Sequence, residues 1–300
     1  MSESAESTEI FRNRGIWLIL AAAVLWGTTG TAQALAPAGS SPLVIGALRL
    51  ALGGSALALS AWLRGGLRHR SWPPLLTIAA GAFVALYQVT FFSAVLKTGV
   101  AAGTIVGIGS APVFAGILEY IVRHRRPGRR WYLSTAVAVF GCLLLVLPAG
   151  DIRIDLAGIV LALAAGFSYA AYALAIKLLL PGRSPEDVTA VIFCLGAIFL
   201  SPLLFHADLA WLGRVNGWLM MLHLGLVATA LSYWLFAGGL KTVAASTAVT
   251  LSLAEPLTAA ILGIAIVGER ISLVSSFGLV LILSALLLLI VPARSEGRRW

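Results

Sequence analysis

The sequence predicts an all-α polytopic membrane protein with ten transmembrane helices, arranged as two inverted five-helix repeats. Hydrophobic residues make up 60% of the 300 residues, charged residues make up 11%, and the mean hydropathy is +0.97. A soluble domain carries about 25% charged residues, so this composition indicates a membrane protein. An internal duplication and the placement of lysine and arginine supply the rest of the prediction.

Each predicted span is an apolar run of roughly 20 residues, the length that crosses the hydrocarbon core. Prolines such as Pro42 and Pro73 stand where runs begin, because proline starts or stops a helix. The polar residues 1–15 precede a full span, so no secretory signal is expected. The runs cover about 16–36, 42–63, 73–96, 99–122, 131–149, 156–179, 187–205, 216–239, 242–267 and 271–292.

The chain repeats itself at an offset of 144 residues. Residues 236–270 match residues 92–126 at ten of 35 positions, and Pro112 aligns with Pro256. Such self-similarity is the signature of a duplicated structural unit. We therefore assign residues 1–150 to the first five-helix repeat and residues 151–300 to the second.

The positive charges predict which way each repeat faces. With the N-terminus in the cytoplasm, sixteen lysines and arginines fall on the cytoplasmic side and four outside, the bias expected of a membrane protein. These charges lie in short gaps between apolar runs, which excludes a nucleic-acid partner despite the net charge of +9. Because five is odd, the second repeat enters the membrane from the opposite side. Inverted repeats are typical of secondary transporters.

Short motifs in both repeats resemble the EamA branch of the drug/metabolite transporter superfamily. The second repeat reads Glu255-Pro256-Leu257, continues as an apolar stretch and ends Gly268-Glu269-Arg270, and the first span contains Leu25-Trp26-Gly27. The first repeat reads Pro112-Val113-Phe114 but has His124-Arg125-Arg126 at its charged stop. The resemblance covers essentially the whole chain. It implies a ten-helix inverted-repeat fold and export of amino acids or other small metabolites.

Polar and aromatic side chains inside the spans are the candidates for a substrate site. Trp26, Thr29 and Gln33 share one face of the first span, where a packed helix interface is the alternative interpretation. We expect the candidates to line a central cavity formed by spans one, three, four, six, eight and nine. The predicted substrate-binding residues are Trp26, Thr29, Gln33, Tyr87, Gln88, Phe91, Gly107, Ala111, Tyr169, Tyr172, Ser232, Tyr233, Ser252 and Glu255.

Glu255 is a carboxylate placed directly before Pro256 and far from either end of its apolar run. A charge at that depth costs about 3 kcal/mol, so it should face protein or a watery cavity. It either binds a ligand ammonium or is a hydrogen-bonded acid that fixes helix packing. Pro112 and Pro256 are predicted kink or gate points, since each frees a carbonyl four residues earlier, at Ile108 and Ser252.

Three further features have mainly structural interpretations. Arg49 lies inside the second span, where it would reach the outer surface or pair with a carboxylate. Glu119 and Arg123 stand four residues apart, which predicts a local ion pair. Glycines at every fourth position from Gly99 to Gly107 predict tight helix packing, with a sliding surface for a moving helix as the alternative.

Together these features predict a secondary transporter of the plasma membrane that exports amino acids or related small metabolites by alternating access. Efflux of cationic or lipophilic drugs and, from another class, a passive channel are the alternatives. An enzyme is not expected, because the chain offers no nucleophile–base pair at membrane depth, and it has no phosphate-binding loop for ATP. The expected partners are a small-molecule substrate and the lipid bilayer, with no cofactor, no metal, no nucleic acid and both termini cytoplasmic.

Overall fold

The computed structural model describes residues 2–67, 71–149, 155–205, 207–268 and 271–291. Ten of its helical segments are long and apolar enough to cross a membrane, within those ranges. They are Phe11–Ala34, Pro42–Leu63, Pro74–Gly99, Ala102–Arg123, Arg129–Val146, Leu156–Leu179, Pro185–Leu204, Val215–Leu240, Ala245–Ile266 and Leu273–Ile290. The predicted fold class is confirmed, and each span overlaps its expected range.

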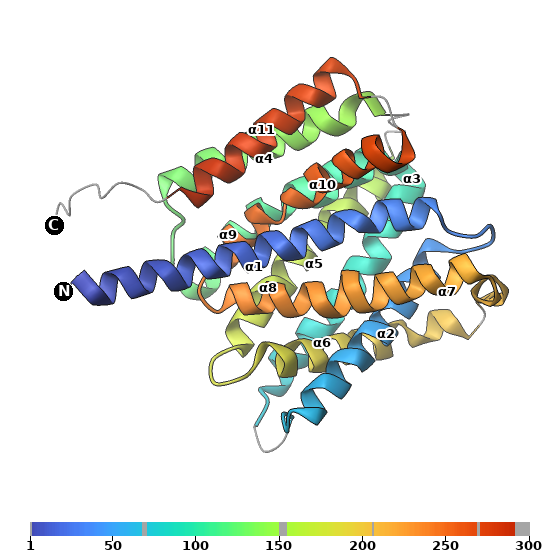
Figure 1. The fold of residues 1–300 in the computed structure, drawn as a ribbon, viewed down its shortest axis with the longest axis horizontal. Helices are drawn as coiled ribbons and strands as arrows, with labels where there is room; N and C mark the ends of the chain where they lie inside the picture. Colours follow the sequence, from blue (N-terminus) through green and yellow to red (C-terminus); the bar gives the residue numbers. More distant parts are fainter. Residues whose placement is uncertain (1, 68–70, 150–154, 206, 269–270, 292–300) are drawn as a thin grey trace.

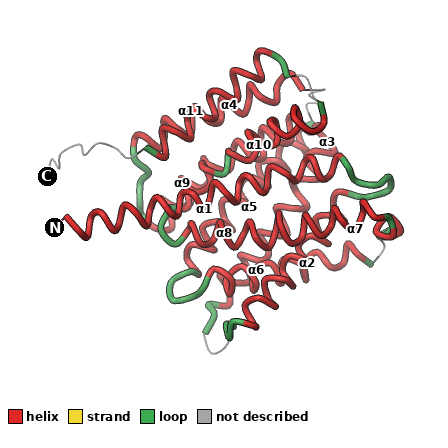
Figure 2. The backbone as a smooth tube through the Cα atoms, viewed as in Figure 1, coloured by secondary structure: helices red, strands yellow, loops and turns green. Residues whose placement is uncertain are grey.

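The main helices carry the labels of Figure 1, and Figure 2 shows that short loops join them. Segment η4 (His223–Leu231) and segment η5 (Gly263–Val267) are π-helical, whereas η1 (Leu147–Ala149), η2 (Ser201–Leu204) and η3 (Ala210–Gly213) are 3₁₀ turns. The α-helices are α1 (Ser2–Ala34), α2 (Pro42–Leu63), α3 (Pro74–Arg123), α4 (Arg129–Val146), α5 (Leu156–Leu179), α6 (Pro185–Leu200), α7 (Val215–Leu222), α8 (Ser232–Leu240), α9 (Ala245–Leu251), α10 (Ala254–Leu262) and α11 (Leu273–Ile290).

Helix α3 contains two spans joined at Gly99. The backbone there has φ 84° and ψ 164°, a conformation that glycine adopts without a Cβ clash. A Cβ on Gly103 would lie 2.9 Å from a Val95 methyl group, so the second span folds back closely over the first. The glycine stripe therefore serves both the turn and the packing.

Helix pairing follows the symmetry of an inverted repeat. Helix α4, the fifth span, packs along α11, the tenth, and α2 packs along α6, the second and seventh spans. Helix α1 packs on α8 and α10, while its counterpart α5 packs on the two spans of α3. Each span thus meets the neighbours that its symmetry partner meets, and Figure 1 shows the α4–α11 pair at the edge of the bundle.

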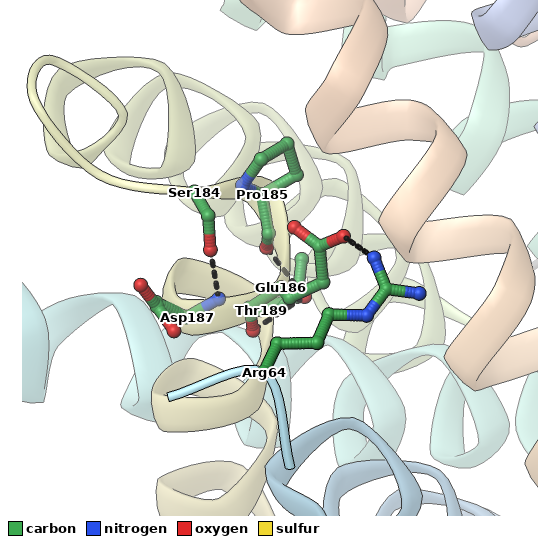
Figure 3. A network of polar contacts seen from close by, with 6 residues as sticks. All are labelled: Arg64, Ser184, Pro185, Glu186, Asp187 and Thr189. Atoms are coloured by element: carbon green, nitrogen blue, oxygen red, sulfur yellow. Dashed lines mark hydrogen bonds and ion pairs between the residues drawn. The ribbon is translucent and has the colours of Figure 1, made fainter. Parts of the chain in front are cut away.

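The junction between α2 and α6 is fixed by a polar network (Figure 3). The Ser184 hydroxyl accepts a hydrogen bond from the Asp187 amide at 3.0 Å and so caps α6. Arg64, at the end of α2, forms an ion pair with Glu186 at 3.1 Å. Thr189 donates to the Pro185 carbonyl at 2.7 Å. Two of these contacts are internal to the start of α6, and the exposed Arg64–Glu186 pair links that start to the end of α2 at one membrane surface.

The first residues of α1 and the last residues of α11 lie at the same end of the bundle (Figure 1). We call this the terminal end and the other the distal end. At the terminal end α1 lies directly on the end of α8, because a Cβ on Gly15 would meet Thr242 and the Gly239 carbonyl. The distal end holds the end of α1 and the start of α2.

Candidate binding cavity

A cavity of about 700 Å³ lies between the repeats and reaches the distal end. The six spans predicted to form the cavity all contribute to its wall, and spans two, five and ten add further residues. The lining residues are Trp26, Gly27, Thr29, Gly30, Thr31, Gln33, Ala34, Pro42, Arg49, Tyr87, Gln88, Phe91, Phe92, Val95, Thr104, Ile108, Leu145, Val146, Pro148, Tyr169, Tyr172, Tyr233, Glu255, Pro256, Ala259, Ala260, Gly263, Ile271, Ser272 and Ser275.

Aromatic rings from four helices form the deep wall of the cavity. The Trp26 ring of α1 lies 4.8 Å from Tyr233 and 6.4 Å from Tyr169, measured between centroids. Tyr87 of α3 lies 5.9 Å from Tyr169 and 6.0 Å from Tyr172. Such distances are typical of interacting rings, and ring packing adds to the energy of burial. These residues lie deep in the bundle rather than in the interfacial belt where tyrosine and tryptophan often gather.

Two hydroxyl contacts fix the orientation of this aromatic wall. Tyr169 donates a hydrogen bond to the Ser252 hydroxyl at 2.6 Å. The Tyr172 and Tyr233 hydroxyls lie 3.1 Å apart, so that one donates a hydrogen bond to the other. The indole nitrogen of Trp26 is buried and has no hydrogen-bond partner among the described residues. A buried N–H without a partner is unusual, and this one belongs to a residue that lines the cavity.

Glu255 lies in the first turn of α10, directly after a break in the ninth span. Helix α9 ends at Leu251, α10 begins at Ala254, and the Glu255 amide donates to the Ser252 carbonyl at 2.9 Å. A carboxylate in a first turn is stabilised by the helix dipole. Ion pairs in the described residues join Arg64 to Glu186 and Arg123 to Glu119, so Glu255 has no basic partner within that part of the chain.

Among the described residues, Arg49 neither reaches the outer surface nor pairs with a carboxylate, the two outcomes expected of it. Its side chain is buried, with 7% of the residue exposed, and lines the same cavity as Glu255. Its Nε donates to the Thr229 hydroxyl and its Nη2 to the Ala228 carbonyl, both at 3.0 Å. Both acceptors are neutral, so these bonds orient the guanidinium without cancelling its charge. An arginine within an apolar run is itself a signal of function, and that signal was available in the sequence.

The acceptors of Arg49 come from a π-helical turn of the eighth span. In η4 the Thr229 hydroxyl donates to the carbonyl of Leu224, five residues earlier, at 2.7 Å. Helix α2 approaches this turn closely, since a Cβ on Gly53 would lie 2.6 Å from a Thr229 methyl group. π-Helical turns occur frequently at functional sites. Here the turn carries the groups that hold Arg49 in the cavity wall.

Most of the predicted substrate-binding residues line the cavity, and four lie behind its wall. Ala111 and Ser232 are fully buried. Ser252 is also buried and holds the Tyr169 hydroxyl. A Cβ on Gly107 would lie 3.5 Å from the Phe91 ring, so this glycine backs a lining residue. The predicted residues that line the cavity are Trp26, Thr29, Gln33, Tyr87, Gln88, Phe91, Tyr169, Tyr172, Tyr233 and Glu255.

The two symmetry-related prolines have different surroundings. Pro112 lies inside α3, where the backbone departs from helical geometry only at Gly99. Pro256 lies in the first turn of α10, beside the break at Ser252 and Leu253, and lines the cavity. The Ser252 carbonyl, predicted to be freed by Pro256, accepts the Glu255 amide instead. The discontinuity is therefore present in the ninth span and absent from this part of the fourth.

The terminal end of the cavity is closed by contacts between the repeats and by the contacts of one lysine within the second repeat. Glu119 is buried, accepts the Ser246 amide at 2.9 Å and forms the predicted ion pair with Arg123 at 3.3 Å. Lys177 donates to the Val243 carbonyl at 2.7 Å and also to the Leu240 carbonyl. The Thr135 and Thr250 hydroxyls share a hydrogen bond of 3.0 Å. Side chains of α3, α4 and α5 thus hold the end of α8, the residues after it, and Ser246 and Thr250 of α9.

Known proteins similar to this chain are transporters. The model of the EamA-like transporter family matches residues 13–147 and 156–291. The uncharacterized transporter YwfM of Bacillus subtilis is 45% identical over 278 residues, which cover 93% of this chain and 94% of that protein. The uncharacterized inner membrane transporter YicL of Salmonella typhimurium is 25% identical and covers 95% and 98% of the two chains.

A solved crystal structure has the same fold as this chain. It superimposes with a TM-score of 0.79 at 20% identity, over 91% of this chain and 97% of that one. The family and its transporter relatives indicate a transporter rather than an enzyme. Two matches to one family model, one in each half, also agree with the duplication read from the sequence. The chain is a multi-pass membrane protein and belongs to the EamA-like transporter family.

Proposed function

We propose that this protein exports zwitterionic small metabolites, amino acids foremost, across the bacterial inner membrane by alternating access. The observation that carries the proposal is the pair of opposite charges, Arg49 and Glu255, which line one cavity without forming an ion pair with each other. Arg49 is the predicted partner of a substrate carboxylate. Glu255 is the predicted partner of a substrate ammonium.

The energetics favour a ligand that brings both charges. Each unpaired charge at this depth costs about 3 kcal/mol, and a zwitterion compensates both at once while leaving the net charge unchanged. A guanidinium presents five donors, and Arg49 uses its Nε and Nη2 on neutral acceptors. Its Nη1 remains to bind a carboxylate, in the charge-assisted geometry that arginine favours.

The aromatic wall supports an apolar substrate body between the two charges. Trp26, Tyr87, Tyr169 and Tyr233 present large, rigid surfaces to the cavity. Tyrosines and tryptophans also tolerate polar atoms, because each carries one hydroxyl or N–H group beside its ring. This combination suits side chains that range from aliphatic to moderately polar.

The one-sided cavity supports alternating access. It reaches the distal end through exposed residues such as Ala34 and Pro148, whereas Glu119 and Lys177 close the terminal end. With both termini in the cytoplasm, as the charge bias predicts, this is an outward-open arrangement. Rocking of the two repeats would open the terminal end and close the distal one.

Counterflow in proteoliposomes tests the proposal. Proteoliposomes that contain the purified protein are loaded with one amino acid of a panel at a time. Exchange with external radiolabelled substrate is then measured in competition with the N-acetyl and methyl-ester derivatives of that amino acid. The N-acetyl form lacks the ammonium and the ester lacks the carboxylate. For the wild type, each derivative should compete about 30-fold more weakly than the zwitterion, which corresponds to one lost charge-assisted contact of about 2 kcal/mol.

Two cavity variants assign the contacts separately. Glu255→Gln should stop discriminating against the N-acetyl derivative, and Arg49→Gln should stop discriminating against the ester. Glu255→Asp and Arg49→Lys keep the charges, and Glu186→Gln removes a carboxylate outside the cavity, so these serve as matched controls. An equal loss of competition by the zwitterion, the N-acetyl form and the ester in either variant would contradict the assignment.

The competing functions have distinct results in the same assay. A carrier of cationic drugs would exchange the ester and lipophilic cations better than the zwitterion, and would depend on Glu255 but not on Arg49. A passive channel would show no counterflow, because trans substrate accelerates exchange only through a carrier. Either result would replace the proposed function.

A further inference from the structure

A second hollow lies on the outside of the bundle, between the second span of α3 and helix α4. Its volume is about 700 Å³, and its lining is almost entirely apolar. Val113, Ile117, Tyr132 and Phe140 border it with 48% or more of their surfaces exposed, which places it on the lipid-facing side. We call it the α3–α4 groove. None of its residues lines the binding cavity.

The groove ends in a cluster of arginines at the terminal end. Arg126 lines the groove, lies with its guanidinium 5.1 Å from the centre of the Tyr120 ring, and donates to the Tyr120 hydroxyl at 3.1 Å. Helix α4 begins after Gly128 without a side-chain cap, so its first amides add partial positive charge. The cluster, at the end of α3 and the start of α4, consists of Arg123, Arg125, Arg126, Arg129 and Arg130.

Two buried donors, one on a residue that lines the groove and one on the residue before it, have no hydrogen-bond partner among the described residues. They are the Nε1 of Trp131 and the Nε of Arg130. Trp131 is 7% exposed and lines the groove, and it packs tightly because a Cβ on Gly116 would lie 2.5 Å from its ring. Buried donors almost always have a partner. A groove with unpartnered donors beside several arginines is therefore suited to an acceptor with negative charge.

We propose that the α3–α4 groove binds an anionic glycerophospholipid. Its phosphate lies between Arg126 and Arg130, an ester or phosphate oxygen accepts the Trp131 N–H, and one acyl chain follows the apolar groove toward Ile105 and Leu143. Basic pockets beside membrane helices recognise anionic headgroups in this way. The lipid holds α4, and through it α11, against the rest of the bundle.

The charge of the mouth favours a lipid over a second copy of the chain. In a dimer with its two-fold axis along the membrane normal, the arginine clusters of both copies would lie at the same depth and repel each other. The apolar groove alone would suit either occupant. The arginines select the one that carries negative charge.

Native mass spectrometry of the purified full-length protein tests the proposal. The probes are phosphatidylglycerol and phosphatidylcholine with identical acyl chains, titrated into detergent-solubilised protein. We expect phosphatidylglycerol to be retained and to raise Tm, and phosphatidylcholine to be retained about tenfold less, since each arginine near an anionic surface contributes measurably to binding.

Two variants separate the headgroup from the acyl chain. Arg126→Gln combined with Arg130→Gln should lower phosphatidylglycerol retention at least tenfold, whereas the exposed pair Arg12→Gln and Arg64→Gln should not. Ala136→Phe fills the groove from an exposed position and should displace the lipid, while Ala82→Phe, on another exposed face of α3, is its control.

Three results would overturn the proposal. The first is equal retention of the two lipids by the wild type, which needs no variant to fold. The second is unchanged retention in Ala136→Phe, which would reduce the site to a surface charge effect. The third is efficient disulfide dimerisation through Ala136→Cys in lipid nanodiscs, which would make the groove an interface between two copies.

Discussion

Glu119 is the contact whose loss should most directly change the conformational balance of the transporter. It reaches from the end of α3 to the amide of Ser246, the second residue of α9, and is 2% exposed. Glu119→Ala removes a charge-assisted hydrogen bond worth about 2 kcal/mol and leaves the Ser246 amide buried without a partner. If this contact exists only while the terminal end is closed, the equilibrium should shift toward opening by roughly 30-fold.

Thiol accessibility measures this shift. Cys142 and Cys194 are replaced by alanine, and Val249→Cys introduces a smaller, fully buried side chain in α9. In lipid nanodiscs, the rate of labelling by a polar thiol reagent reports the fraction of molecules with an open terminal end. The rate should rise up to 30-fold in Glu119→Ala, by the free energy given above. Glu119→Gln keeps an acceptor and should show a smaller rise.

The matched control is Glu186→Ala, which removes a carboxylate from the first turn of α6 at the same end of the bundle. Its partner Arg64 is largely exposed, so the ion pair contributes less than about 1 kcal/mol and labelling should change little. Equal labelling of Glu119→Ala and wild type, with both folded by Tm, would refute the role of Glu119 in closing the terminal end. Equal increases in Glu119→Ala and Glu186→Ala would refute it as well.

Two further predictions concern packing around the cavity. Gly27→Ala should destabilise the protein by about 1–3 kcal/mol and reduce transport, because the new Cβ would lie 2.5 Å from Thr258. Gly30→Ala, which meets nothing within 4 Å, should raise Tm slightly through helix propensity, and equal Tm shifts for both glycines would contradict this account of the α1–α10 crossing. For Tyr172→Phe and Tyr233→Phe, a double-mutant cycle of unfolding free energies should give a coupling of about 1 kcal/mol, and zero coupling would show that their hydroxyls do not interact.

Composition and duplication predicted the fold because the bilayer leaves few choices. Every backbone polar group in lipid must be satisfied within its own segment, so long apolar runs become helices regardless of their detailed sequence. The ten spans follow from that constraint. The inversion follows from an odd number of spans in each half, and the aligned prolines Pro112 and Pro256 marked the duplication.

The cavity was predicted less completely, because helical spacing tells which residues share a face but not what lies opposite that face. Ser232 and Ser252 occur at the expected positions in their spans, yet both are buried away from the cavity: Ser232 donates to the Thr229 carbonyl of its own span, and Ser252 accepts the Tyr169 hydroxyl of α5. Gly107 and Ala111 lie behind Phe91 and the adjoining helix for the same reason. For Gly107 and Ala111, the packing of α3 on α5 decides that they do not reach the open space.

The sequence alone determined the number of spans, their inverted order and the presence of two charges at membrane depth. The tertiary structure decided that Arg49 and Glu255 share one cavity and that Glu119 binds the Ser246 amide of α9. The difference has a physical cause. Transfer of a segment into lipid depends on its own composition, whereas the partner of a buried charge depends on residues far away in the chain. Arg49 is held by Thr229, 180 residues away, through a π-helical turn that its own segment does not encode.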